Sequence, residues 1–439
     1  MRIILDIPIM TSKLLRAVDG DPSAIAIAEI GAIVTDSREA RAGDLFFALA
    51  VGVEDRARHI RDAAARGAVT VGDADGASLR VADARRVLLE AARIYKEGLH
   101  RLCHTVGVTG SAGKTTATRF ISRLLSDGHR VHSTVGNYNN IIGLSISVLC
   151  APRDTEVLVL EMGMNAEGEI RELAEATRPD VCLITNIGTA HIGRLGSREA
   201  IARAKREIVT EACRVVVCPA GEVLLDDIPC KQTYAIDDKA DYSLIGRNFI
   251  CRAKIVSTPP LAEHLRPAMC AAMAIATLID GEVGDCTGKI SADDGRASTH
   301  RIRGITVIDD SYNSSAEAVL MMLNHLAGLA PPRAVLLSDM LELGEMAPAL
   351  HFRVGEAVSE AGVDCLFVIG DYAEEVARGA IFRGFRGEIR IYPGGVSLRE
   401  VAEDLLDGVD GGHLLIKGSH ATGLYGIIEI LKELENDWL

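Results

Sequence analysis

The chain has 439 residues, of which 48% are hydrophobic and 25% charged, and its formal net charge at pH 7 is −14. This length is enough for two to four domains, and the acidic balance argues against a sequence-neutral nucleic-acid binder, which usually carries a basic surface. No run approaches the ~18 apolar residues of a membrane span, and the start of the chain is too short for a secretory signal, so we expect a cytoplasmic protein without membrane or nucleic-acid partners.

Short apolar runs alternate with helical segments along residues 1–103 and predict a small α/β domain. Strands are expected at 33–38, 44–48 and 68–71, with a helix at 57–66 before the third strand. Ser37 and Arg38, at the end of the first predicted strand, belong either to a solvated strand end or to a ligand pocket. The residues themselves leave both interpretations open.

A glycine-rich loop lies between a predicted strand, which includes Val106 and Val108, and a predicted helix at 115–125. Backbone N–H groups of such a loop wrap a polyphosphate, whose charge the helix dipole also favours. Lys114 would reach the outer phosphates, and the hydroxyl of Thr115 would bind Mg²⁺. The strand and helix on both sides favour a nucleotide-phosphate site over an incidental turn, with the residues Gly110, Ser111, Ala112, Gly113, Lys114, Thr115 and Thr116.

Residues 104–290 continue the alternation of strands and helices that is typical of a mostly parallel sheet. The strand at 156–162 carries Glu161 near its end, where a carboxylate beside a phosphate loop is well placed to hold Mg²⁺. Asn186 follows the next strand, at 181–185, and His191 lies further along the same predicted edge.

A linker at 291–296 leads into a third region with predicted strands at 334–337, 365–369 and 413–416. The predicted fold class is therefore α/β with three domains. Residues 1–103 form a small N-terminal substrate-binding domain, residues 104–290 a central P-loop domain with a mostly parallel sheet, and residues 291–439 a C-terminal Rossmann-like domain.

Several motifs point to one family. The loop sequence TGSAGKTT resembles the ATP loop of the Mur ligases, which join amino acids or peptides to a cell-wall precursor. The segments TVGNYNNIIG, ARAKREI and VIDDSYNSS resemble further motifs of the same family, in the same order. The resemblance extends over nearly the whole chain and implies ATP and two Mg²⁺ ions as cofactors.

The resemblance also implies roles that spacing alone leaves open. An isolated histidine such as His191 is more often structural than a ligand, and Lys205 lies in a segment with the helical spacing of a solvated charged face. In Mur ligases the matching histidine binds Mg²⁺, and the matching lysine is carbamylated by CO₂ and helps to hold a second Mg²⁺. The implied nucleotide contacts are Asn186, Arg296, Asp310, Tyr312 and Asn313, and the implied substrate contacts are Ser37, Arg38, Asn137, Asn139, Asn140, Lys417 and Ser419.

Two family motifs are altered. The D-G-H marker of the uridine pocket is replaced by a segment that contains Arg56 and Ala57. The H-N-x-x-N motif, whose first Asn contacts adenine, begins here with His264 and Leu265, so both Asn residues are missing. We therefore expect the uridine pocket and the recognition of adenine to differ from the family pattern.

The sequence predicts a monomeric ATP-dependent ligase that activates a small-molecule carboxylate as an acyl phosphate for attack by a nucleophile, with Lys114, Lys205 and His191 as catalytic residues. Its motifs are most similar to the branch of the family that adds a dipeptide in peptidoglycan precursor synthesis. One alternative is a Mur-type ligase redirected outside the cell wall, such as the archaeal ligase of coenzyme F(430) synthesis, which activates a tetrapyrrole propionate. A P-loop switch or a non-catalytic homologue is the other alternative.

Overall fold

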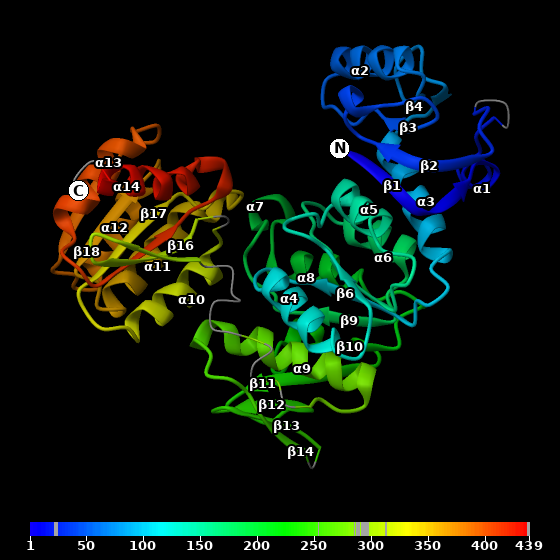
Figure 1. Ribbon diagram of the computed structural model, residues 1–439. Coiled ribbons are helices and arrows are strands. Elements are labelled where there is room, and N and C mark those ends of the chain that lie inside the picture. Colours follow the sequence, from blue (N-terminus) through cyan, green and yellow to red (C-terminus); the bar gives the residue numbers. More distant parts are fainter. Residues whose placement is uncertain are drawn as a thin grey trace.

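The computed structural model describes residues 1–21, 25–252, 254–284, 286, 290, 298–311 and 314–436. In this part of the chain, three separate β-sheets, each flanked by helices, follow one another along the sequence (Figure 1). The predicted α/β class with three domains is confirmed. None of the described helices is long and apolar enough to cross a membrane.

The N-terminal sheet has the strand order β1-β2-β3-β4-β5, in which β1 is antiparallel to β2 and the other pairs are parallel. One face packs on α2, and the other packs on α1 and α3. The first predicted strand was wrong beyond Val34, because Asp36 caps a short 3-10 helix and accepts the N–H of Arg38. The elements are β1 (Arg2–Met10), α1 (Thr11–Ala17), β2 (Glu29–Val34), η1 (Ser37–Glu39), β3 (Leu45–Phe47), α2 (Val53–Ala65), β4 (Val69–Gly72), β5 (Leu79–Arg80) and α3 (Ala84–Glu97).

The central sheet has the order β14-β13-β12-β11-β10-β9-β6-β8-β7 among the described residues. Its strands from β7 to β12 are parallel, and β12, β13 and β14 form an antiparallel extension at one edge. The strands are β6 (His104–Thr109), β7 (Val131–Ser133), β8 (Val157–Glu161), β9 (Val181–Ile184), β10 (Val215–Pro219), β11 (Lys231–Ile236), β12 (Tyr242–Ile245), β13 (Asn248–Cys251) and β14 (Lys254–Ser257). The helices are α4 (Lys114–Leu125), α5 (Ile141–Leu149), α6 (Glu169–Thr177), α7 (Ile192–Leu195), α8 (Arg198–Arg206) and α9 (Arg266–Asp280), with the 3-10 helices η2 (Val223–Leu225) and η3 (Glu263–Leu265).

The apolar strands of the central sheet are buried on both faces because alternate side chains point to opposite helical layers. In β8, Val157 and Val159 pack with α4 and α9, whereas Leu158 and Leu160 pack with the layer that contains α5, α6 and α8. The layers on the two faces are visible in Figure 1. This arrangement leaves the carboxyl ends of the parallel strands as the place where polar side chains can gather.

The C-terminal sheet has the order β15-β16-β20-β17-β18-β19, with β15 antiparallel to β16 and the remaining pairs parallel. In β17, Ala334 and Leu336 face α13 and α14, and Val335 and Leu337 face α10, α11 and α12. The strands are β15 (Ser298–Ile302), β16 (Ile305–Asp310), β17 (Arg333–Ser338), β18 (Cys365–Ile369), β19 (Glu388–Tyr392) and β20 (His413–Lys417). The helices are α10 (Ala316–Ala327), α11 (Ala347–Glu360), α12 (Ala373–Phe382), α13 (Leu398–Gly408) and α14 (Ile427–Asn436), with the 3-10 helices η5 (Gly344–Met346), η6 (His420–Thr422) and η7 (Leu424–Gly426).

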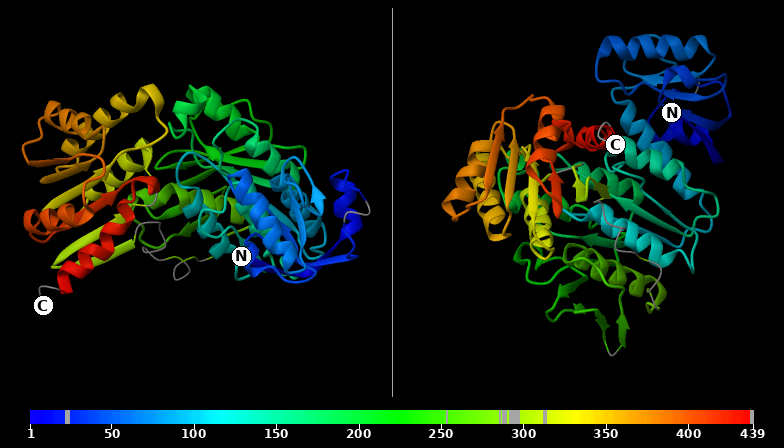
Figure 2. Two further views of the ribbon diagram at one scale, coloured as in Figure 1. Left: turned by 90° about the horizontal axis from the view of Figure 1, so that it is seen from above. Right: turned by 60° about the vertical axis from the view of Figure 1, so that its left-hand side comes forward.

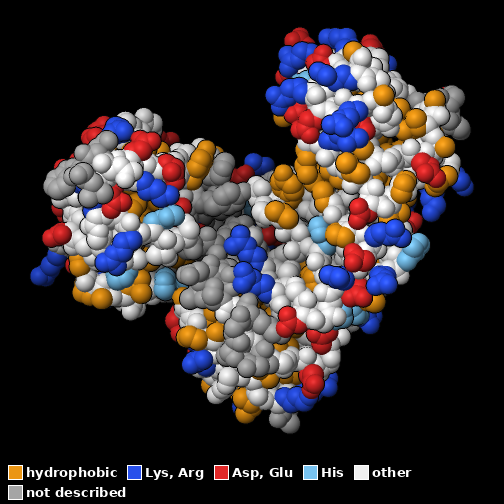
Figure 3. All heavy atoms as spheres, viewed as in Figure 1, with side chains coloured by type: hydrophobic (Ala, Val, Ile, Leu, Met, Phe, Trp, Pro, Cys, Tyr) orange, Lys and Arg blue, Asp and Glu red, His pale blue; other side chains and the backbone are white. Residues whose placement is uncertain are grey.

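The central domain joins the other two domains. In the left view of Figure 2 the N-terminal and C-terminal domains lie at opposite ends of it, and Figure 3 shows an open notch between them. Helix α3 packs against α5 and α6, and the buried Tyr95 hydroxyl donates to the carbonyl of Ala151 at 2.6 Å. The N-terminal junction is thus a packed apolar interface.

Candidate active site

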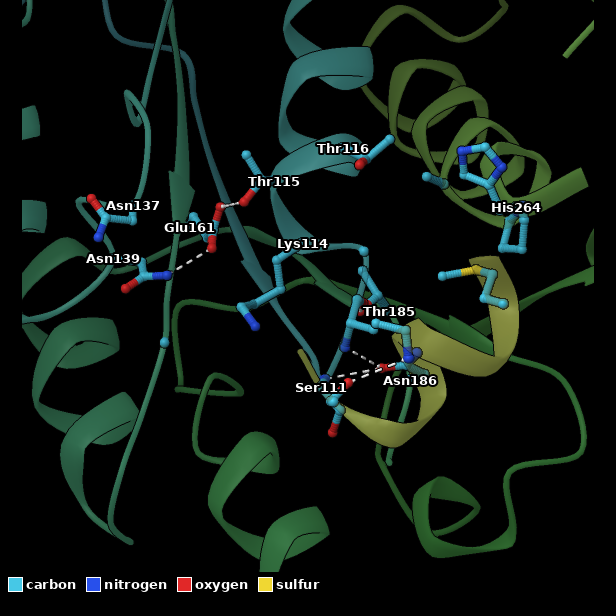
Figure 4. Close-up of a pocket in the computed structure, with 18 of the residues that line it drawn as sticks. Ser111, Lys114, Thr115, Thr116, Asn137, Asn139, Glu161, Thr185, Asn186 and His264 are labelled. Carbon is cyan, nitrogen blue, oxygen red and sulfur yellow. Dashed lines mark hydrogen bonds between the residues drawn. The ribbon is translucent and has the colours of Figure 1, made fainter. Parts of the chain in front are cut away.

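Three neighbouring parallel strands bring their carboxyl ends together at one edge of the central sheet. β6 lies between β8 and β9 and leads into the phosphate loop, β8 ends at Glu161, and β9 is followed by Thr185 and Asn186. A cavity of about 470 Å³ opens at this edge and is lined by both the central and the C-terminal domain (Figure 4). Of the predicted site residues, it is lined by Ser111, Ala112, Gly113, Lys114, Thr115, Thr116, Asn137, Asn139, Asn140, Glu161, Asn186, His191, Asp310 and Lys417.

The phosphate loop needs glycine at its first turn. Gly110 has φ +148°, and a Cβ there would collide with Oγ1 of Thr185. That hydroxyl donates to the carbonyl of Ala112 at 2.6 Å, and Lys114 Nζ donates to the carbonyl of Gly110 at 2.8 Å. The loop is therefore held closely against the end of β9, with its lysine folded back onto the loop backbone.

Asn186 braces the loop. Its Oδ1 accepts the N–H groups of Ser111 and Ala112, each at 2.9 Å, and the N–H of Gly188 donates to Ser111 Oγ at 2.8 Å. Because Asn186 occupies two of the loop amides, the N–H groups at the start of α4 are the candidates for binding an anion. In this structure Asn186 shapes the phosphate site.

Glu161 is the centre of a polar cluster opposite the loop. It is 1% exposed, and its two oxygens accept from Thr115 Oγ1 at 2.6 Å and Asn139 Nδ2 at 2.7 Å (Figure 4). Among the described residues, no three or more His, Cys, Asp and Glu side chains are grouped as a metal site. The carboxylate and hydroxyl oxygens of Glu161 and Thr115 nevertheless suit Mg²⁺, which keeps several of its waters and needs few protein ligands.

His191 reaches the cavity from the loop between β9 and α7, in a left-handed conformation with φ +67°. Its Nδ1 lies 2.6 Å from Oε2 of Glu342, which belongs to the C-terminal domain and also pairs with Arg194 at 2.8 Å. Burial lowers the pKa of His191, while Glu342 acts in the opposite direction. In the neutral tautomer that donates from Nδ1, Nε2 carries a lone pair for a ligand.

Lys205 lies on α8 and is 2% exposed, so the alternative of a solvated helix face is wrong. Burial and repulsion by Lys114 lower the pKa of Lys205 well below its usual value, and Glu317 acts in the opposite direction. The lysine is not among the residues that line the cavity. Such burial of a cation is unusual unless it is paired or loses its charge.

The C-terminal domain contributes a buried ion pair. Asp310 and Lys417 are register partners in the parallel strands β16 and β20, and Nζ of Lys417 lies 2.9 Å from Oδ2 of Asp310. Both residues line the cavity, and Lys417 is 1% exposed. Ser419 is buried, does not line the cavity, and donates to the carbonyl of Asp339 at 3.1 Å.

The end of the cavity away from Glu161 is largely apolar and was not predicted. It is lined by His264, Tyr234 and the apolar residues Leu265, Pro267, Ala268, Met321 and Met322. The ring of His264 lies 4.6 Å from that of His325, and burial together with His325 lowers the pKa of His264 to about 4. Its Nδ1 is buried without a hydrogen-bond partner among the described residues. This end of the cavity therefore presents a neutral imidazole and apolar side chains.

Some of the other residues lie away from the cavity, and Asn140, which lines it, has a structural role. Ser37 and Arg38 are in the N-terminal domain and do not line the cavity, and Arg38 pairs with Asp36. Arg56 bonds to Asp73 and to the carbonyls that precede α2, so it fixes a loop. Asn140 caps α5 by accepting the N–H of Gly143 at 2.9 Å. Three predicted nucleotide contacts, Arg296, Tyr312 and Asn313, lie outside the described residues.

The phosphate loop at the edge of a parallel sheet, facing a second α/β domain, defines a nucleotide-dependent enzyme of two cooperating domains. Residues 108–247 match the Mur ligase middle domain, and residues 295–420 match the family described as Mur ligase, glutamate ligase domain. The chain belongs to the Mur ligase family.

Within this family, the chain is similar in sequence and in structure to the ligases that add D-alanyl-D-alanine. The chain is 32% identical over 380 residues to UDP-N-acetylmuramoyl-tripeptide–D-alanyl-D-alanine ligase of Bacillus subtilis, over 81% of each chain. It is 31% identical to the ligase of the same name from Synechocystis, over 92% of each chain. The crystal structure of MurF from Acinetobacter baumannii has a TM-score of 0.84 at 25% identity and covers 98% of this chain and 100% of its own.

Proposed function

We propose that this chain is an ATP-dependent ligase that joins D-alanyl-D-alanine to UDP-N-acetylmuramoyl-tripeptide in peptidoglycan precursor synthesis. The observation that carries the proposal is a single cavity in which the phosphate loop and Glu161 face Asp310 and Lys417 of another domain. The identity with the Bacillus subtilis ligase supports the same substrates.

In the first step, the terminal carboxylate of the tripeptide attacks the γ-phosphorus of ATP and forms an acyl phosphate, with ADP as the leaving group. The work of the protein in such a transfer is positioning and charge stabilisation. Lys114, which lies over the loop at Gly110, would turn toward the outer phosphates. The first N–H groups of α4 would hold the remaining phosphate oxygens.

We infer that Thr115, Glu161, His191 and Lys205, the last as a carbamate, would hold two Mg²⁺ ions. When bound, these ions would neutralise negative charge on the phosphates. The lowered pKa of Lys205 supports the carbamate, since a neutral amine is the form that adds CO₂. The product is an anion, and its oxygens would suit a hard cation where an ammonium group would repel it.

In the second step, the amine of D-alanyl-D-alanine attacks the carbonyl of the acyl phosphate and releases phosphate. Lys417 and Ser419 of the C-terminal domain are the candidates for orienting this nucleophile. The pairing of Lys417 with Asp310 would keep the lysine fixed in place. Because the cavity is shared by two domains, their closure would exclude the water that hydrolyses an acyl phosphate.

The test is an assay of the purified chain with UDP-N-acetylmuramoyl-tripeptide, D-alanyl-D-alanine, ATP and Mg²⁺. We expect ADP, phosphate and the pentapeptide product in equal amounts, and hydroxylamine should trap a hydroxamate when the dipeptide is left out. Release of AMP and pyrophosphate would contradict the acyl phosphate. ATP turnover with a tetrapyrrole propionate, but none with the tripeptide, would contradict the substrate and retain the reaction class.

A further inference from the structure

Glu317 crosses from the C-terminal domain to the central domain. It is the second residue of α10, after the capping residue Ser315, and its Oε1 accepts the N–H of Thr189 at 2.5 Å. The approach is close, because a Cβ on Gly188 would lie 2.6 Å from Cδ of Glu317. The carboxylate therefore fits against the backbone of residues 188 and 189, and the fit depends on glycine at 188.

The second oxygen of the same carboxylate supports a specific role. Oε2 is buried and has no hydrogen-bond partner among the described residues. A buried carboxylate oxygen without a partner is costly unless a positive charge lies near it. The side chain is nevertheless kept buried at the domain junction, where its other oxygen accepts the N–H of Thr189. Glu317 is thus retained at the junction at an energetic cost, which points to a role in holding the neighbouring loop.

The loop that Glu317 holds also supports the phosphate loop. Asn186 accepts from the amides of Ser111 and Ala112, Gly188 donates to Ser111, and Thr189 donates to Glu317. Four consecutive residues, 186–189, therefore link the phosphate loop to the C-terminal domain. A short, closely packed segment of this kind transmits a displacement at one end to the other.

We propose that Glu317 is a positioning residue that couples closure of the C-terminal domain to the shape of the phosphate loop. This inference rests on the proposed function, because it assigns the coupling to the same nucleotide site. When the C-terminal domain closes, Glu317 fixes Thr189 and, through Gly188 and Asn186, the loop that binds the phosphates. When the domain moves away, the loop loses this support.

Two substitutions separate the hydrogen bond from the charge. Glu317→Ala removes both, whereas Glu317→Gln keeps an oxygen that accepts the Thr189 N–H. Glu374→Ala is the matched control, because Glu374 is also the second residue of its helix, α12, and is exposed. The control removes the same favourable helix-terminus charge without touching the domain junction.

The measurements are small-angle scattering with a non-hydrolysable ATP analogue, the affinity for that analogue, and the KM for ATP against kcat. We expect Glu317→Ala to increase the radius of gyration measured by scattering. It should also weaken nucleotide binding roughly tenfold, which is the effect expected for the loss of a hydrogen bond to a charged group. Glu317→Gln should keep the compact particle, and Glu374→Ala should match the wild type. A Glu317→Ala variant with wild-type dimensions and affinity, or Gln and Ala variants that open equally, would overturn the proposal.

A second variant tests the same contact if Glu317→Ala does not fold. Gly188→Ala introduces a methyl group against the carboxylate, and the backbone at 188 does not have the positive φ that favours glycine. We expect Gly188→Ala to open the particle, and the double variant Gly188→Ala/Glu317→Ala to bind nucleotide no worse than Gly188→Ala alone. Strictly additive effects would contradict the coupling. Since scattering and binding need no turnover, failure of the assay with the tripeptide would refute the proposed function without affecting this test.

Discussion

Replacement of Lys205 by methionine should stabilise the protein and abolish its activity. The lysine is 2% exposed, and burial and Lys114 lower its pKa. Methionine keeps the unbranched stem and removes the charge. Since the folded state must either deprotonate the lysine or bury its charge, the substitution removes a cost that the unfolded chain does not have.

The size of the effect follows from the cost of burying a cation. Replacement of buried charges by apolar groups of similar volume stabilises proteins by about 1–4 kcal/mol. We expect a gain in this range, because burial and Lys114 lower the pKa of Lys205. Between the lowered pKa and 10.5 the unfolded chain binds the extra proton, so the cost falls as pH rises and disappears above 10.5.

The assay is thermal unfolding in CO₂-free buffer from pH 7 to pH 10, with the exposed Lys13→Met on α1 as the control. At neutral pH we expect a higher Tm for Lys205→Met, by roughly 2–4 °C per kcal/mol for a domain of 150–250 residues. The advantage should shrink toward pH 10, and Lys13→Met should show neither effect. A lower Tm for Lys205→Met, or a difference that does not change with pH, would refute the reasoning.

The other predictions concern the phosphate site. Lys114→Ala should lose ATP turnover while circular dichroism remains unchanged, because the side chain lies at the loop and outside the apolar core; normal ADP release would contradict the phosphate-loop assignment. Lys205→Ala should lose most activity and recover part of it in acetate, which can occupy the anionic position, whereas Lys205→Arg should be inactive with or without acetate; an active Arg variant would rule out the carbamate. Tyr234→Phe removes the hydrogen bond to the buried carbonyl of Thr185, at 2.6 Å, and should cost about 1 kcal/mol of stability and raise the KM for ATP. An unchanged Tm and KM for Tyr234→Phe would show that the Thr185 carbonyl needs no partner.

The sequence was sufficient to predict those site residues that lie on one contiguous strand, loop or helix with a recognisable pattern. The phosphate loop was predictable because strand, glycines and helix are contiguous, and Glu161 because it ends the next strand of the same edge. Glu317 and Glu342 were missed because their contacts are made between domains. In sequence, Glu317 is an ordinary acidic residue in the first turn of a helix, which the helix dipole alone would explain.

The periodicity of the sequence could not predict that Lys205 is buried. Its neighbours Arg203 and Arg206 give the segment a charged character, and both are more exposed than Lys205. Which of these cations is buried depends on how α8 packs against the sheet. The apolar end of the cavity was missed for a similar reason, since Met321 and Met322 come from α10 of the C-terminal domain.

The two junctions of the central domain differ in what holds them. Helix α3 joins the N-terminal domain to the central domain through packed apolar side chains and the buried Tyr95 hydroxyl, and such an interface is not weakened by the screening of charges. Arg194 and Glu342 form a partly exposed ion pair across the other junction, so dissolved ions screen their attraction. A higher ionic strength should therefore increase the mobility of the C-terminal domain, while the N-terminal and central domains continue to tumble as one body.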